Sequence, residues 1–256
     1  MSAPLLSVRD VRKRFAGLSA VEDFAMDLGP AEIVGLIGPN GAGKSTVLNL
    51  LSGFHRPECG SIRFAGHDVT GASPGEIARR GLVRTFQHIR LFGDLTVRQN
   101  VEVATQSWLP CSLAGSLLRT RRYRERLRVM RDAVDELLGD FELAHLQHHP
   151  AGALPYGDQR RVEIVRALAT RPRALLLDEP AAGMNAPEAL ALAEFLAETS
   201  ARHGIAILVV EHHFEVVRRL CRRVIVMDQG TVIATGAPRE VTEDAAVIRA
   251  YLGAAA

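Results

Sequence analysis

The sequence predicts an α/β fold in which helices cover a parallel sheet, with an antiparallel β subdomain at the N-terminal side and an inserted helical subdomain. Three observations support this. A glycine-rich stretch at 38–46 stands between an apolar run and a helical pattern, buried-strand and helix patterns alternate after residue 172, and strand patterns are missing from about 108 to 154. With 256 residues, 47% hydrophobic and 5% aromatic, we expect one domain over 5–253, with the helical subdomain at about 96–165.

The glycine-rich stretch fits the phosphate-binding pattern G-x-x-x-x-G-K-S/T at every fixed position. Before it, 33–37 predicts a short buried strand, and after it a helix runs to Gly53. Glycines allow positive φ and bring backbone N–H groups against phosphate oxygens, while Lys44 can reach the β- and γ-phosphates and the Ser45 hydroxyl can ligate Mg²⁺. The residues predicted to bind ATP here are Gly38, Pro39, Asn40, Gly41, Ala42, Gly43, Lys44, Ser45 and Thr46.

The N-terminal part predicts two antiparallel strands, at 5–11 and 20–26, because apolar and polar residues alternate in both. Phe15 lies between them. It could stack on an adenine ring or pack in the core, and the sequence favours neither. Residues 60–70 predict a further hairpin.

Two capping boxes mark helix starts in the next part of the chain. Ser73 to Glu76 predicts a short helix that stops at Gly81, and Thr96 to Gln99 predicts one running towards Ser107. Between them, 82–87 predicts a strand.

The segment from about 108 to 154 predicts an inserted group of helices. Its stretch Arg119–Arg131 holds seven arginines, which fit either a solvated helix face or a surface for anionic lipid or an acidic partner. The side chains of His145, His148 and His149 lack a nearby carboxylate or cysteine that would complete a metal site.

The C-terminal part predicts the parallel sheet. The strand 174–179 closes on two carboxylates, Asp178 and Glu179, and apolar residues followed by Asp are what a Mg²⁺ ligand at a strand end requires. Glu179 could act as general base on an attacking water. The other predicted elements are helices at 158–170, 188–203 and 245–252, and strands at 205–210, 223–227 and 231–235.

Charge, cysteines and hydropathy exclude several classes of protein. A formal charge of +2 does not indicate nucleic-acid binding, and the three cysteines, Cys59, Cys111 and Cys221, form no metal or redox motif. Basic residues near the N-terminus interrupt any signal-peptide core. The longest aliphatic runs fall far below the roughly 18 residues of a membrane span, so we expect a chain that does not cross a membrane.

The remaining motifs resemble those of ATP-binding cassette (ABC) proteins. The segment Leu154–Arg161 resembles the family's signature L-S-G-G-Q, Gln87 at the end of a predicted strand resembles the Q-loop glutamine, and His212 after a buried strand resembles the switch histidine. The resemblance covers Phe15 to His212, nearly the whole chain.

The resemblance implies a division of labour among these residues. ABC cassettes pair head to tail and hold two ATP molecules between the phosphate loop of one subunit and the signature of the other. Catalysis would then involve Glu179, His212 and Gln87. Mg²⁺ would be held by Ser45, Gln87 and Asp178. The signature residues at the partner's ATP would be Leu154, Pro155, Tyr156, Gly157 and Asp158.

Narrower matches at 84–92, 179–185 and 247–253 are similar to the branched-chain amino-acid importers. Here the resemblance implies an ATPase subunit on the cytoplasmic face of the inner membrane, with a second cassette, transmembrane permease subunits and, indirectly, a periplasmic binding protein as partners. Alternatives are a urea or amide importer, a lipopolysaccharide exporter, or a soluble ABC ATPase. Departures from the wider pattern are Pro155, Tyr156, Asp158 and Asn185.

Overall fold

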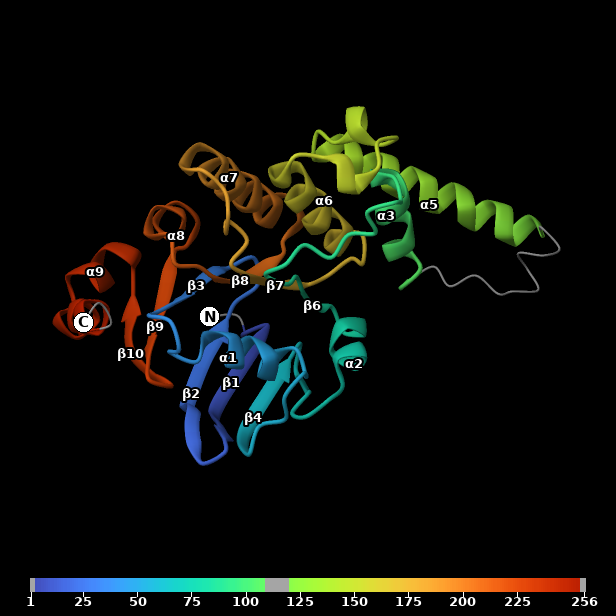
Figure 1. Ribbon diagram of the computed structural model, residues 1–256. Coiled ribbons are helices and arrows are strands. Elements are labelled where there is room, and N and C mark those ends of the chain that lie inside the picture. The colour runs from blue at the N-terminus through green and yellow to red at the C-terminus, as the bar shows by residue number, and fades with distance from the viewer. Residues whose placement is uncertain (1–2, 109–119, 254–256) are drawn as a thin grey trace. The chain divides into compact units, whose positions relative to one another are not determined.

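The computed structural model describes residues 3–108 and 120–253 (Figure 1). Contacts divide the chain into two compact units: Met1–Gln87 with Arg173–Ala256, and His88–Pro172. The helical segment predicted at about 96–165 falls within the second unit. Cys111 and Arg119 lie outside the described residues. Within the described ranges, no helix combines the length and apolar composition that a membrane-spanning helix needs.

The first unit contains a four-stranded antiparallel sheet in the order β2-β1-β4-β5. Alternating burial along β1 explains it, since Leu6 and Val8 point into the core and pair across the sheet with residues of both β2 and β4. The predicted N-terminal strands and the 60–70 hairpin are confirmed, and the first two strands are longer than predicted. The strands are β1 (Leu6–Phe15), β2 (Leu18–Leu28), β4 (Cys59–Phe64) and β5 (His67–Asp68).

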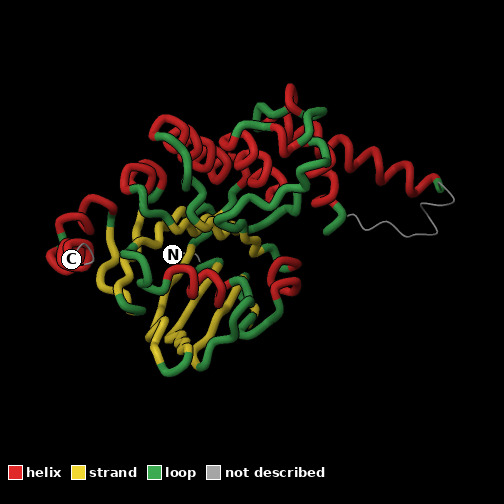
Figure 2. Tube along the Cα trace, in the orientation of Figure 1, coloured by secondary structure: helices red, strands yellow, loops and turns green. Residues whose placement is uncertain are grey.

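The first unit also contains a six-stranded sheet in the order β10-β9-β3-β8-β7-β6, parallel except for β10. The strands of both sheets are drawn yellow in Figure 2. All residues of β3, β7 and β8 are buried, which is why their sequences are apolar runs, interrupted only by Asp178 at the end of β7. The strands are β3 (Ile33–Ile37), β6 (Leu82–Arg84), β7 (Ala174–Asp178), β8 (Ala206–Val210), β9 (Arg223–Asp228) and β10 (Thr231–Gly236).

One predicted strand is shorter than expected. The strand predicted at 82–87 ends at Arg84, so Gln87 lies in the following loop and does not end a strand. The Thr85 N–H still donates to the Leu176 carbonyl at 3.0 Å. Phe86 then packs edge-on against the Phe54 ring, 5.7 Å between centroids. Phe86 is therefore apolar because it packs on another aromatic ring. The chain has already left the sheet after Arg84.

Helices of the first unit follow the predicted positions, with two additions. The short helices α8 and α9 were not predicted. The helices are α1 (Lys44–Leu51), α2 (Pro74–Arg79), α7 (Ala186–His203), α8 (Phe214–Leu220), α9 (Pro238–Glu243) and α10 (Ala245–Gly253). The capping box at Ser73 is present, with the Ser73 N–H donating to Glu76 at 2.9 Å.

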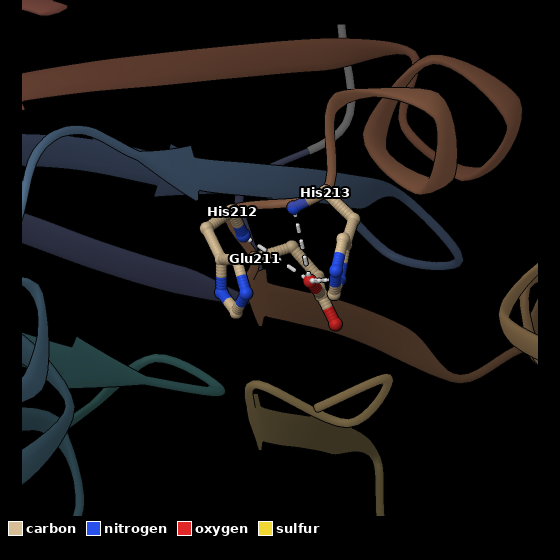
Figure 3. A group of neighbouring side chains, drawn as sticks. All are labelled: Glu211, His212 and His213. Atoms are coloured by element: carbon tan, nitrogen blue, oxygen red, sulfur yellow. Dashed lines mark hydrogen bonds and ion pairs between the residues drawn. The ribbon is translucent and has the colours of Figure 1, made fainter. Parts of the chain in front are cut away.

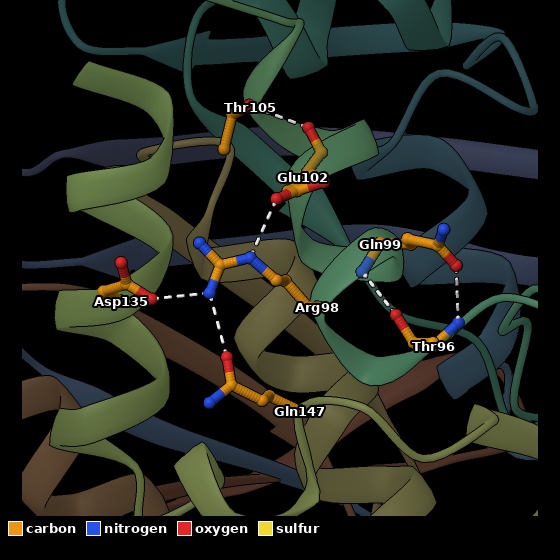
Figure 4. Close-up of polar contacts among 7 residues, drawn as sticks. All are labelled: Thr96, Arg98, Gln99, Glu102, Thr105, Asp135 and Gln147. Carbon is orange, nitrogen blue, oxygen red and sulfur yellow. Dashed lines mark hydrogen bonds and ion pairs between the residues drawn. The ribbon is translucent and has the colours of Figure 1, made fainter. Parts of the chain in front are cut away.

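The second unit is helical in its described part. Arg98 links three of its segments, because its guanidinium binds Glu102 of α3 at 3.0 Å, Asp135 of α5 at 2.6 Å and Gln147 at 2.9 Å (Figure 4). The predicted capping box at Thr96 opens α3. The elements are α3 (Val97–Thr105), α5 (Arg121–Asp140), η1 (Ala144–Leu146), η2 (Ala151–Ala153) and α6 (Tyr156–Leu168).

The arginine-rich segment forms the first half of α5. Arg121, Arg124, Arg128 and Arg131 are exposed. This arrangement fits both a solvated helix face and a docking surface, so both alternatives stay open.

Candidate nucleotide site

The glycine-rich loop joins β3 to α1 and has a backbone that only glycine accepts at two positions. Gly38 and Gly43 have φ of 148° and 100°. A Cβ atom at Gly38 would overlap the Met227 carbonyl oxygen, and one at Gly43 would overlap the Ala20 carbonyl oxygen. The chain around the loop therefore fixes its path.

A tight turn supports the loop from one side. The Gly230 N–H donates to the Ala42 carbonyl at 3.0 Å, and the Gly230 carbonyl accepts from the Glu22 N–H at 2.8 Å. Gln229 and Gly230 connect β9 to β10, both with positive φ (46° and 84°), as in a two-residue type I′ turn. The loop thus rests on both sheets of this unit.

The start of α1 suits a phosphate group. Within the described chain, no side chain caps this helix at its N-cap residue, Gly43, which leaves its first N–H groups for an anion. The Lys44 ammonium donates to the carbonyls of Gly38 and Pro39 at 2.7 and 2.8 Å. Burial lowers the pKa of Lys44, and the carboxylates of Glu179 and Asp178 oppose that shift. The loop, the helix terminus and the buried cation fit a nucleotide's phosphates.

Asp178, the last residue of β7, is held by an arginine that the sequence analysis did not single out. Its carboxylate binds Arg84 at 2.8 Å, and Arg84 also donates to Asn49 at 2.6 Å and Ser52 at 3.1 Å. Asn49 belongs to α1, so the pair ties the end of β7 to the helix after the phosphate loop. Arg84 ends β6, the strand beside β7, and this position in the sequence could have predicted its ion pair with Asp178.

The three predicted catalytic residues lie together. The Gln87 amide nitrogen donates to the Glu179 carboxylate at 2.7 Å, and the other Glu179 oxygen lies 3.9 Å from His212 Nδ1. The Glu179 backbone has φ of 45°, a sparsely populated conformation for glutamate, and its N–H donates to Val210 at 2.9 Å. Such strain is common where a side chain is held for function.

Phe15 ends β1 and is 42% exposed, so its interpretation as a core residue is wrong. Its ring lies edge-on to His55, 5.2 Å between centroids, with the Lys13 ammonium 5.3 Å from its centroid. Stacking on an adenine stays a prediction.

The signature segment belongs to the second unit. Pro155 is the N-cap residue of α6, so this helix begins at Tyr156, two residues before the predicted start. Leu154 is buried and Tyr156 is 42% exposed. A Cβ atom at Gly157 would meet no other atom of the described residues within 4 Å. The first turn of α6 is therefore open.

Glu211 was not predicted as a site residue. It is a charged residue directly after the apolar strand β8, and that position was the available signal. One carboxylate oxygen of Glu211 and one ring nitrogen each of His212 and His213, atoms that could ligate a metal ion, lie within 4.8 Å of one another. Among the described residues, His145, His148 and His149 do not cluster with other His, Cys, Asp or Glu side chains in this way.

Comparison with known proteins finds one family throughout. The family model of ABC transporters matches residues 21–182, and that of branched-chain amino acid ATP-binding cassette transporters matches residues 231–256. The chain is 45% identical to the high-affinity branched-chain amino acid transport ATP-binding protein LivG of Escherichia coli K12 and 39% identical to its counterpart BraF of Pseudomonas aeruginosa, each over the full length of both proteins. A solved ATP-binding cassette of an ABC transporter, in its ADP conformation, is 30% identical and superposes with a TM-score of 0.85 over 98% of this chain and all of that one.

Proposed function

The chain belongs to the ATP-binding cassettes of ABC transporters, and on this premise we propose that it hydrolyses ATP to power the uptake of branched-chain or other hydrophobic amino acids. The observation that carries the choice of solute is the C-terminal match at 231–256 to the branched-chain cassettes, together with LivG and BraF as full-length relatives. This match favours the amino-acid branch over urea, amide or lipopolysaccharide transporters.

The proposed assembly contains a second cassette, arranged head to tail, and transmembrane permease subunits, with a periplasmic binding protein delivering the solute. The chain would lie on the cytoplasmic face of the inner membrane. The open first turn of α6 supports a partner at the signature segment. Half-buried Ile89 and Leu91 with the 51% exposed Phe92 support a docking surface for the permease.

The donor set at the end of β7 fits Mg²⁺, which prefers oxygen ligands. Asp178 offers a carboxylate, Ser45 a hydroxyl at the start of α1, and Gln87 an amide. The helix α1 contacts β7, which supports a joint role for Ser45 and Asp178. When bound, the ion would neutralise charge on the β- and γ-phosphates.

Hydrolysis is assigned to side chains gathered at the ends of β7 and β8. Glu179 would take the proton from the attacking water. The 2.7 Å bond from Gln87 supports an orienting role on that carboxylate. His212 would hold the γ-phosphate, and Lys44 would turn from its loop carbonyls to the β- and γ-phosphates.

The test is leucine uptake in cells that lack the gene and carry one variant each. Glu179→Gln should leave ATP binding intact and lower ATP turnover about 10²–10⁴-fold, abolishing uptake. Lys44→Ala should weaken ATP binding itself. The control is Glu198→Gln, the same substitution on the exposed surface of α7. Wild-type leucine uptake with Glu179→Gln would contradict the assignment of Glu179 as the base. If the wild-type gene restored transport of a different solute but not of leucine, the amino-acid branch would be contradicted.

A further inference from the structure

Glu211 is a carboxylate with no exposed surface, placed between the last residue of β8 and His212. A buried charge is costly unless it is paired or fully hydrogen-bonded. The groups that donate to Glu211 therefore indicate its role.

Each oxygen of Glu211 accepts hydrogen bonds from backbone donors. One accepts from the Ala181 N–H at 2.8 Å. The other accepts from the N–H groups of His212 and His213, at 3.1 and 3.4 Å, and lies 3.5 Å from His213 Nδ1 (Figure 3). Both oxygens thus face the chain itself, which argues against a metal ion as their main partner.

These donors lie on two different loops. Ala181 follows Glu179 by two residues, on the loop after β7, whereas His212 and His213 follow β8. The strands β7 and β8 are parallel neighbours, with Asp178 opposite Val210. One buried carboxylate therefore joins the loop of the proposed base to the loop of the switch histidine.

We propose that Glu211 is a positioning residue, which sets the separation between the Glu179 carboxylate and the His212 imidazole by fixing the backbones of both loops. The 3.9 Å between those side chains is the quantity it controls. This inference rests on the proposed ATP hydrolysis and adds to it a residue that touches neither nucleotide nor water.

The chemistry predicts a specific defect for Glu211→Gln. Glutamine keeps the shape but replaces one acceptor oxygen by an NH₂ group, which would face a backbone N–H. Losing one hydrogen bond to a charged group corresponds to roughly a ten- to hundredfold effect. We expect turnover in the assembled transporter to fall by that factor, while ATP affinity stays within about twofold because the phosphate loop is untouched.

Two further measurements separate positioning from a general structural role. Amide NMR of the purified chain should show changed signals for Ala181 and His212 in Glu211→Gln, and unchanged ones in Glu215→Gln, whose side chain is 75% exposed on α8. In single-turnover assays the double variant Glu211→Gln/His212→Ala should be no slower than His212→Ala alone, because the two residues act as a unit.

Several results would overturn the proposal. They are unchanged turnover in Glu211→Gln, a loss of ATP affinity equal to the loss of turnover, or a double variant slowed by the full factor of both single ones. If Glu211→Gln does not fold, Glu211→Asp takes its place with the same expected split between turnover and affinity. A wild-type transporter without ATPase activity would contradict the proposed function instead, and the amide signals would still test the contacts of Glu211.

Discussion

The phosphate loop and the signature segment are both glycine-containing turns at the start of a helix, but they differ in how closely the rest of the described chain packs against them. Around the phosphate loop, a Cβ atom at Gly43 would overlap a backbone oxygen, and Gly230 bonds Ala42 directly. At the signature, Gly157 has open space and Tyr156 is 42% exposed.

This difference separates two kinds of site. The phosphate loop is supported on its outer side by its own unit, so it is shaped before a ligand arrives. Among the described residues, nothing supports the first turn of α6 in this way, which fits a site completed by another subunit. Nucleotide affinity should therefore depend on the phosphate loop, and hydrolysis in the assembly on both the phosphate loop and the signature segment.

The largest effect is expected from Gly43→Ala. Positive φ costs alanine about 1–3 kcal/mol, and the overlap with Ala20 adds about 1–3 kcal/mol. We expect ATP affinity to fall roughly a thousandfold, measured by titration with a fluorescent ATP analogue. Gly157→Ala, the matched control, should bind ATP like the wild type, and equal losses in both variants would remove the distinction between the two turns.

Much of this contrast could be predicted from the sequence. The phosphate loop could be recognised because each of its residue types is needed, and β3, β7 and β8 could be recognised because full burial makes their residues apolar, apart from Asp178 at the end of β7. The open space around Gly157 could not be predicted from the sequence, because a glycine at a helix start looks the same whether or not another residue packs against it.

The unpredicted contacts join residues far apart in the chain. Arg84 binds Asp178 across 94 positions, and Glu211 accepts from Ala181 across 30. Only the pairing of the strands that carry them brings these groups together. Phe86 misled the prediction for a different reason, since an aromatic contact and a strand both require an apolar residue there.

The second prediction concerns the body of α6, below its open first turn. Arg160 is fully buried and binds Glu163 at 2.6 Å. Arg160→Ala should lower the free energy of unfolding by about 3 kcal/mol. This is the low end of the range for breaking a buried ion pair, because the Glu163 carboxylate still accepts a hydrogen bond from the Arg90 N–H. Urea unfolding measures it. Arg161→Ala, next along the helix and partly exposed, should cost under about 1 kcal/mol, and a reversed order would place the buried face wrongly.

The third prediction compares helix starts. Thr96 caps α3 by accepting from the Gln99 N–H at 3.2 Å, whereas Pro155 gives α6 no side-chain cap bond among the described residues. Thr96→Ala should cost about 1 kcal/mol of stability, and Thr96→Ser should restore most of it. Pro155→Ala should change stability less. Thermal unfolding followed by circular dichroism would detect the difference, and an equally large loss at Pro155 would contradict it.

The smallest effect is expected at the surface pair of Arg98 and Asp135. The hydrogen bond from Arg98 lowers the pKa of Asp135, although burial opposes the shift. A lowered pKa means stability that is present above the unfolded value of about 3.9 and is lost as pH falls through the folded value. Because Asp135 is 59% exposed, the contribution should stay below about 1 kcal/mol. Asp135→Asn should be less stable than wild type at pH 7, and the difference should shrink as the pH falls below about 4. A constant difference would show that the ion pair is not its source.

The most direct test of the account is Gly157→Val, with ATP affinity and ATP turnover measured on the same preparation of the assembled transporter. Valine puts a β-branched side chain on the open turn that a partner's nucleotide is proposed to meet. The account predicts ATP affinity within about twofold of wild type and turnover lowered at least about tenfold, the loss expected when a hydrogen bond to a charged phosphate is removed. If ATP affinity instead falls as far as in Lys44→Ala, with turnover falling in proportion, the signature segment does not act across subunits and the account is wrong.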